Sequence, residues 1–108
     1  ILGAAGLGKI GEWFPDNEAK YKGIDSREIL KKIVSDIKIK GLIVYQIDAT
    51  VICEEPKITP HKEKMKKILM METKCSLVNI KATTTERLGS IGRKEGIAAM
   101  ASVSLLCK

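Results

Sequence analysis

Three consecutive threonines followed by a glutamate lie near the C-terminal end of this 108-residue chain. Thr83, Thr84 and Thr85 offer hydroxyls and turn amides, and Glu86 adds a carboxylate that can hold a divalent cation. Hydroxyl and carboxylate oxygens around a hard cation are groups that can hold a diphosphate. Arg93, a few residues on, can bind another phosphate. A threonine-rich strand edge followed by a capped turn is the alternative, and spacing alone leaves both interpretations open.

Two further segments carry groups that can bind a ligand. The segment "CEEPKITPH", residues 53–61, joins a predicted strand to a predicted helix, and ligands in α/β folds bind at strand ends. Its amides can read the edge of a planar base and Lys57 can meet a phosphate, although a plain strand–helix turn is equally compatible. The loop "FPDNE", residues 14–18, is either a substrate-contacting loop or a solvated turn in which Asp16 caps locally. The single histidine, His61, is expected at the surface and cannot form a zinc site alone.

The spacing of apolar residues predicts the elements that position these groups. Residues 25–41 are expected to form a helix, because Asp25 or Ser26 can cap it, apolar residues follow at helical spacing, and Gly41 can end it. A second helix is expected over 59–72, with Thr59 as its cap and Pro60 in its first turn. Residues 1–8 are small and apolar and are expected to finish a helix.

Three strands are expected, over residues 42–53, 76–82 and 96–107. The last is almost entirely small and apolar, which predicts burial on both faces. The first alternates with a period of two, which predicts that one set of side chains shares a face (Ile43, Tyr45, Ile47, Ala49, Val51) and the other set the opposite face (Val44, Gln46, Asp48, Thr50). The order helix–strand–helix–strand–strand predicts an α/β (α+β) ferredoxin-like sandwich, with the helices packed on one face of the sheet.

Composition narrows the classes of function. With 44% hydrophobic and 30% charged residues, the chain is expected to form a single folded domain, and its net charge of +6 favours anionic partners.

Three cysteines without a CxxC pair argue against a disulfide framework or a cysteine-built zinc site. No apolar run reaches the length of about 18 residues that indicates a membrane span. The few aromatics are not interleaved with basic runs, which disfavours nucleic-acid binding. The lone GxGxxG match at 6–11 lacks the preceding strand of a dinucleotide site.

Taken together, the segments "GLGKIGEWFPDNE", "EEPK" and "VNIKATTTERLGSIGRKEGIAA" resemble the 2-C-methyl-D-erythritol 2,4-cyclodiphosphate synthase family, over essentially the whole chain. The resemblance implies a phosphorus–oxygen lyase of the non-mevalonate (MEP) isoprenoid pathway. It cyclises 4-diphosphocytidyl-2-C-methyl-D-erythritol 2-phosphate and releases CMP. The resemblance also implies a homotrimer with active sites between protomers, a zinc ion, and a magnesium or manganese ion. The family can hold an isoprenoid diphosphate in its central channel, and its pathway implies the bacterial cytoplasm or a plastid-type organelle.

Carried over position by position, the resemblance assigns roles to individual residues. Thr84 would be catalytic and would steady the transition state, and Glu86 would bind the second divalent ion. Arg93 would line the mouth of the trimer channel. Thr83 would hold the diphosphate together with Thr84, and Thr85 and Arg93 would also bind substrate. The remaining residues would bind two other parts of the substrate: the ribose or erythritol hydroxyls (Gly11, Phe14, Pro15, Asp16, Asn17, Glu18) and the cytosine (Cys53, Glu54, Glu55, Pro56, Lys57, Ile58).

The sequence also departs from the family pattern. The family's zinc ligands, an Asp-x-His pair and a further His, lie upstream of the matching region, so the chain is expected to be the C-terminal two-thirds of the domain. Lys9 stands where the family usually has an acid near the ribose. Ser90 replaces a usual Phe and Met100 an acid, both at the trimer channel. The alternative interpretation is a trimeric nucleotide-binding relative that lacks the zinc site and the chemistry.

Overall fold

The computed structural model describes residues 1–108 as five main elements and four short helices. The main elements are the helices α2 (Ser26–Ile39) and α3 (Lys62–Thr73) and the strands β1 (Leu42–Ile52), β2 (Leu77–Thr83) and β3 (Ala98–Cys107). The short helices are α1 (Ile10–Trp13), η1 (Ala19–Tyr21), η2 (Thr59–His61) and α4 (Gly89–Gly92). None of the helices combines the length and the apolar character that spanning a lipid bilayer would require.

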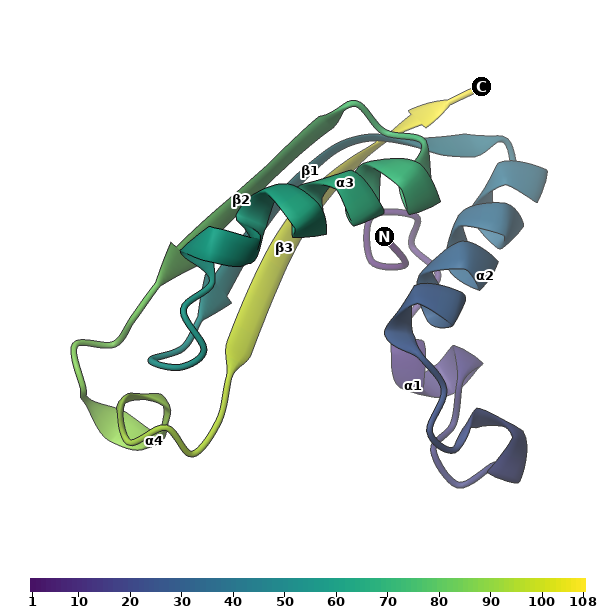
Figure 1. Ribbon diagram of the computed structural model, residues 1–108. Coiled ribbons are helices and arrows are strands. Elements are labelled where there is room, and N and C mark those ends of the chain that lie inside the picture. The colour runs from purple at the N-terminus through teal and green to yellow at the C-terminus, as the bar shows by residue number, and fades with distance from the viewer.

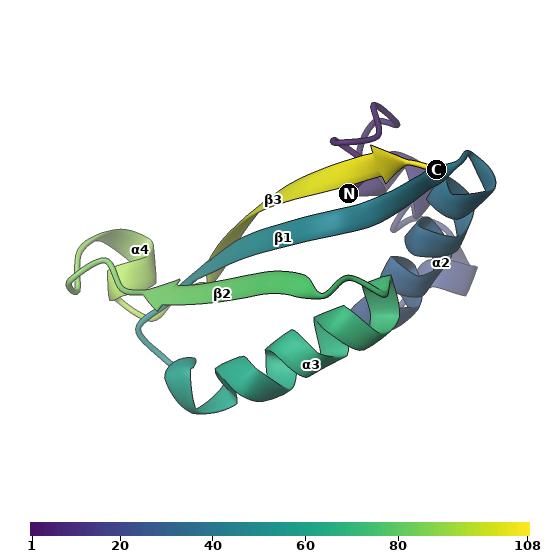
Figure 2. The same ribbon diagram turned by 90° about the horizontal axis from the view of Figure 1, so that it is seen from above.

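The strands form one sheet in the order β2-β1-β3, with β2 parallel and β3 antiparallel to the central β1 (Figure 1). Helix α3 connects β1 to β2 and runs beside them, while α2 packs against β1 and α3 (Figure 2). The predicted α/β architecture is therefore confirmed. Its sheet has three strands and β1 lies directly beside β2, whereas a ferredoxin-like sandwich is a split βαβ arrangement with four strands in the order βαββαβ.

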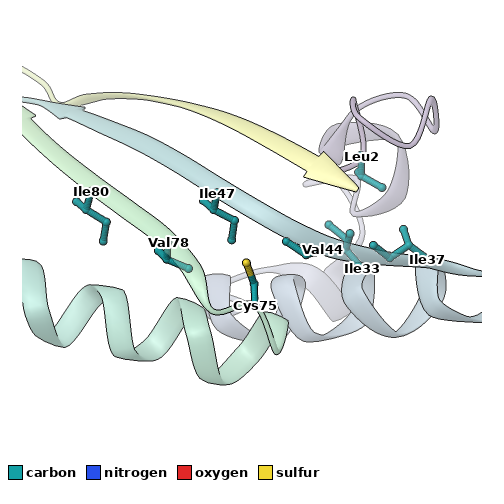
Figure 3. Close-up of a cluster of buried hydrophobic side chains, with 8 residues drawn as sticks. All are labelled: Leu2, Ile33, Ile37, Val44, Ile47, Cys75, Val78 and Ile80. Atoms are coloured by element: carbon teal, nitrogen blue, oxygen red, sulfur yellow. The ribbon is translucent and has the colours of Figure 1, made fainter. Parts of the chain in front are cut away.

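Aliphatic side chains between the sheet and the helices make the core (Figure 3). The most deeply buried residue is Ile37 of α2, whose exposed fraction is 0%. The sheet contributes Val44 and Ile47 from β1 and two residues from β2, and the first residues of the chain add Leu2. The core thus joins segments from both halves of the sequence and fixes the strand ends relative to the helices.

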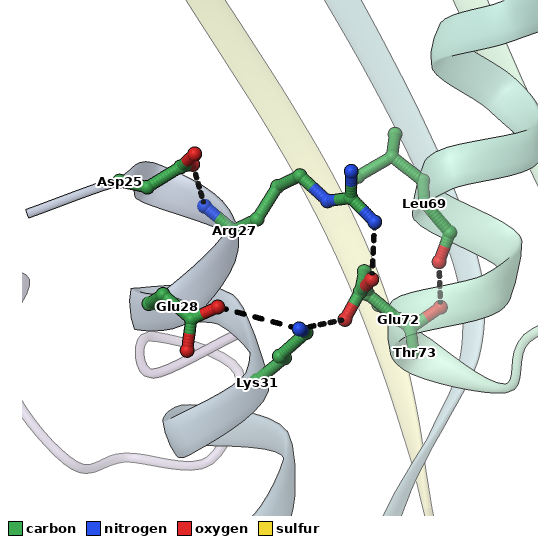
Figure 4. A network of polar contacts seen from close by, with 7 residues as sticks. All are labelled: Asp25, Arg27, Glu28, Lys31, Leu69, Glu72 and Thr73. Atoms are coloured by element: carbon green, nitrogen blue, oxygen red, sulfur yellow. Dashed lines mark hydrogen bonds and ion pairs between the residues drawn. The ribbon is translucent and has the colours of Figure 1, made fainter.

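The predicted signals of α2 are found in the structure. The Asp25 side chain accepts a hydrogen bond from the Arg27 amide at 2.8 Å, and Gly41 has the left-handed φ of 81° that ends the helix. An ion pair then fastens α2 to α3, because Arg27 Nη2 lies 2.8 Å from Glu72 Oε1 (Figure 4). Lys31 also approaches the Glu72 carboxylate, at 4.0 Å.

The strict alternation predicted for β1 is wrong at one point. Val44 and Ile47 both lie in the core, although they were expected on opposite faces. The register with β3 slips between Val44 and Gln46, so Tyr45 is an extra residue, and it is 49% exposed. Such a bulge changes which side chains face inward from that point on.

The predicted burial of the last strand on both faces is also wrong for the single chain. β3 is an edge strand, and most of its residues are exposed, including Met100 at 68%. The helices cover only the face that includes Val103 and Leu105, both partly buried against the core. An apolar sequence therefore lies on a sheet face that nothing in this chain covers.

Two expectations about helices need correction. Residues 1–8 form turns and not the end of a helix, since Gly6 and Gly8 have left-handed φ values of 70° and 86°. Thr59 is not a side-chain cap, because η2 already begins there and the capping position is Ile58. Pro60 does occupy the first turn, as predicted.

Candidate functional site

The predicted nucleotide segment and the threonines meet at one end of the sheet. β1 and β2 are parallel, so their carboxyl ends lie together, with Ile52 opposite Thr83. The ladder continues one step further, because the Cys53 amide donates to the Thr83 carbonyl at 3.1 Å. The antiparallel β3 begins at this same end, with Ala98 opposite Ile52. Residues 53–58, 83–86 and 93 are thus gathered around one end of the sheet.

The loop after β1 presents backbone groups to solvent. Cys53 is buried, and its Sγ lies 3.4 Å from the Pro56 carbonyl oxygen, which folds the loop back on itself. The amides of Glu54, Glu55 and Lys57 donate to no other group of the chain. Free backbone donors could read the edge of a base, which remains a prediction for this loop.

The three threonine hydroxyls have different hydrogen-bonding states. Thr84 Oγ1 accepts a hydrogen bond from the Glu86 amide at 3.2 Å, which leaves its own hydrogen free to donate. Thr85 Oγ1 donates to the Leu88 carbonyl at 2.7 Å, so its hydrogen is already used within the turn. Thr83 Oγ1 makes a long contact of 3.4 Å with the Thr84 carbonyl. Thr84 is therefore the threonine best prepared to donate to an anionic oxygen.

Glu86 lies on an exposed turn just after these threonines. Glu86 and Arg87 have left-handed φ values of 54° and 64°, unusual for two consecutive residues other than glycine. One exposed carboxylate fits a magnesium or manganese ion, because Mg²⁺ is commonly held by one or two carboxylates together with substrate phosphates and water.

A zinc site does not fit the residues of this chain. No group of three or more His, Cys, Asp or Glu side chains is close enough together to hold a metal ion. His61 is exposed at the end of η2, where a surface position was predicted.

Arg93 and its neighbours border the same end of the sheet. The Arg93 guanidinium pairs with Glu95, and Lys94 Nζ lies 3.0 Å from Glu55 Oε1. All four side chains are more than half exposed. The second pair joins the loop after β1 to the segment before β3.

The predicted hydroxyl-binding residues lie elsewhere in the chain. Gly11 belongs to α1, and 14–18 follow it as an irregular loop in which Phe14 packs edge-on against Tyr21, with 5.2 Å between ring centroids. Both views place α1 near α2 and away from α4 and the carboxyl ends of β1 and β2 (Figures 1 and 2). A single copy of the chain does not bring the two halves of the predicted substrate set together.

Sequence reasoning missed two residues that shape this site. The Arg87 amide donates to Glu54 Oε1 at 3.0 Å, so Glu54 contributes its side chain as well as its backbone. The buried Gly92 packs against the Arg87 backbone, since a Cβ there would lie 2.2 Å from the Arg87 carbonyl carbon. The Gly-x-x-Gly spacing was the available signal for this close approach.

Comparison with known proteins matches residues 1–106 to the YgbB family. The chain belongs to the YgbB family. It is 46% identical to a 2-C-methyl-D-erythritol 2,4-cyclodiphosphate synthase of Stutzerimonas stutzeri, over 100% of this chain and 69% of that protein. It is 51% identical to a bifunctional enzyme IspD/IspF of Campylobacter hominis, over 97% of this chain and 28% of that protein.

A similar solved structure supports the fold directly. The Plasmodium falciparum IspF in complex with CDP has a TM-score of 0.84 and 30% identity, covering 99% of this chain and 65% of that chain. The present chain thus spans about two thirds of its single-function YgbB relatives and under a third of the bifunctional ones. The family resemblance expected from the motifs is confirmed.

Proposed function

We propose that the protein containing this chain is a 2-C-methyl-D-erythritol 2,4-cyclodiphosphate synthase. Membership of the YgbB family and relatives named for this activity support the proposal. The observation that carries it is the meeting of the free loop amides of Glu54, Glu55 and Lys57 with Thr84 and Glu86 at one end of the sheet. This arrangement suits a nucleoside diphosphate whose base lies on the loop and whose phosphates lie on the threonine turn.

In the proposed reaction, an oxygen of the 2-phosphate attacks the β-phosphorus of the diphosphate. A cyclic diphosphate forms as the bond between the β-phosphorus and the bridging oxygen breaks, and CMP leaves with that oxygen. The free hydroxyl hydrogen of Thr84 would donate to the anionic oxygens as their charge changes in the transition state. A magnesium or manganese ion on Glu86, when bound, would neutralise phosphate charge and align the reacting groups. Thr83 and the loop amides would hold the substrate in position.

We propose that the active enzyme is a homotrimer with each site between two protomers. The separation of Gly11 and 14–18 from the threonine turn within one chain supports this assembly, because a second copy would supply the missing half (Figures 1 and 2). The uncovered sheet face also supports it, since Leu77, Met100 and Leu106 are 45–68% exposed there. An isoprenoid diphosphate in the central channel, near Arg93, and zinc ligands outside these 108 residues belong to the same proposal.

We further propose that the reaction takes place in the bacterial cytoplasm or in a plastid-type organelle. The sources of the similar proteins support both settings, since they include bacteria and Plasmodium falciparum. No role in binding nucleic acid or membranes is proposed.

Release of CMP tests the proposal directly. The full-length protein, supplied with zinc and magnesium or manganese, is expected to convert the diphosphocytidyl substrate to CMP and a cyclic diphosphate. Phosphorus NMR would identify the cyclic product. If the protein binds CDP but its turnover stays at background, the non-catalytic nucleotide-binding relative is favoured. If it neither binds CDP nor turns over the substrate, both the enzyme and the non-catalytic relative are rejected.

A further inference from the structure

We propose that Glu54 is a positioning residue whose carboxylate holds the turn at Glu86 and Arg87, and thereby couples nucleotide binding to divalent-ion binding. This inference rests on the function proposed above. Glu54 belongs to the loop whose amides would read the cytosine. Its side chain, however, points to the other half of the site, where Glu86 would hold the ion.

The turn needs an external restraint. Glu86 and Arg87 are both left-handed, with φ values of 54° and 64°, and neither is a glycine. Side chains of L-amino acids disfavour this conformation, so two in succession persist only where surrounding contacts hold them. Strained backbone of this kind is concentrated at ligand-binding and catalytic sites.

Two contacts hold the Arg87 backbone, one from Glu54, which precedes it in the sequence, and one from Gly92, which follows it. Glu54 Oε1 accepts its amide hydrogen at 3.0 Å, across 33 positions of sequence. Gly92 supplies the second contact, because even one carbon added there would lie within 2.8 Å of the Arg87 Cα, C and O atoms. A carboxylate on a backbone amide is a charge-assisted bond, stronger than a neutral one.

Movement of the turn at Glu86 and Arg87 would displace the Thr84 hydroxyl. The Glu86 amide donates to Thr84 Oγ1 at 3.2 Å, so the turn also orients the hydroxyl proposed to act in the transition state. Glu54 thus connects the nucleotide loop to both Glu86 and Thr84 through one hydrogen bond. Binding of a nucleotide on the loop is expected to order the turn and strengthen ion binding, and ion binding is expected to strengthen nucleotide binding equally.

The test compares Glu54→Ala and Glu54→Gln with Asp25→Ala in the full-length protein. Asp25 is a matched control, because its carboxylate also accepts a backbone amide, that of Arg27 at 2.8 Å, but on α2 and outside the proposed site. Manganese binding is followed by electron paramagnetic resonance, with and without CDP. Turnover, KM and amide hydrogen exchange over 84–92 are measured in parallel.

In Glu54→Ala, the manganese concentration for half-saturation with CDP present is expected to rise roughly tenfold, the ratio expected from losing one charge-assisted hydrogen bond. Its turn amides are expected to exchange faster and kcat to fall more than KM rises. Glu54→Gln keeps an acceptor oxygen and is expected to recover part of each effect. Asp25→Ala is expected to match the wild type in all three measurements.

A second pair of variants tests the contact between Gly92 and the Arg87 backbone. Gly92→Ala is expected to reproduce the manganese and exchange effects of Glu54→Ala, because its Cβ displaces the Arg87 backbone. Gly96→Ala is the control, since a Cβ there meets nothing within 4 Å.

Equal manganese binding and equal exchange in Glu54→Ala and Asp25→Ala would overturn the inference. So would a loss of thermal stability in Glu54→Ala with no change in hydrogen exchange at the turn. If the wild type releases no CMP, the function proposed above fails, while metal binding and hydrogen exchange still decide the role of Glu54.

Discussion

The amide of Cys53 donates a hydrogen bond to the carbonyl of Thr83, with 3.1 Å between nitrogen and oxygen. This bond extends the parallel ladder beyond the last residue of β1. It sets the separation between the loop after β1 and the turn after β2. Neighbouring strands lie about 4.8 Å apart. The loop after β1 and the turn after β2 are therefore held side by side.

Thr84→Ala is expected to lower kcat by roughly 10²-fold with little change in KM, because one donor to the developing anionic oxygens is lost. Thr84→Ser should keep most of the activity. The measurement is steady-state CMP release, with Ser35→Ala, an exposed hydroxyl on α2, as the control. A Thr84→Ala enzyme with an unchanged kcat would remove this hydroxyl from the mechanism.

Glu86→Gln is expected to raise the magnesium or manganese concentration needed for half-maximal rate, because a neutral amide binds a hard cation less well than a carboxylate does. Titration of the rate with each metal measures this shift. Glu63→Gln is the control, since Glu63 is exposed on α3 and makes no ion pair. Identical titration curves for Glu86→Gln and the wild type would assign the ion to other groups.

Ile37→Ala is expected to lower the free energy of unfolding by about 2–5 kcal/mol, because it opens a cavity where α2 packs in the core. The side chain of Ile37 is 0% exposed, whereas Ile39, two residues on, is 82% exposed. Ile39→Ala should change stability by about 0.5 kcal/mol or less. Urea denaturation of both variants checks the comparison, and similar losses would contradict the placement of α2 on the sheet.

Asp48 is expected to make stability depend on pH in the acid range. Two hydrogen bonds to the Asp48 carboxylate hold its pKa below the ordinary value of 3.8, and the bond from Lys81 has a larger effect than the bond from Asn79. The charged form is therefore favoured in the folded state. Its contribution is present above the unfolded pKa and is lost as the pH falls through the lowered folded pKa. The melting-temperature difference between wild type and Asp48→Asn should be present at neutral pH and shrink below about pH 4. A difference that grows on acidification would contradict this sign.

Several features of the fold follow from local sequence. Asp25, the apolar spacing of α2 and Gly41 predicted a helix that the structure confirms, because caps and helical periodicity act within a few residues. The strands were also placed correctly to within about two residues, since β-branched runs between turn residues have few alternatives. The threonines, the acid and the loop after β1 were proposed as ligand-binding groups from residue type and spacing, and the family resemblance assigned their individual roles.

Other features depended on contacts that local sequence does not contain. The bulge at Tyr45 put Val44 and Ile47 on the same side, because pairing with β3 sets the register of β1. The apolar β3 is exposed in one chain, because its place at the sheet edge depends on which strands pair with it.

The contact between Glu54 and Arg87 joins residues 33 positions apart, so no local sequence pattern predicts it. The amino-acid sequence by itself determined the two long helices, the three strands and the candidate groups for binding a diphosphate. The tertiary structure decided which of them meet, because strand register and close backbone packing arise from contacts between distant segments.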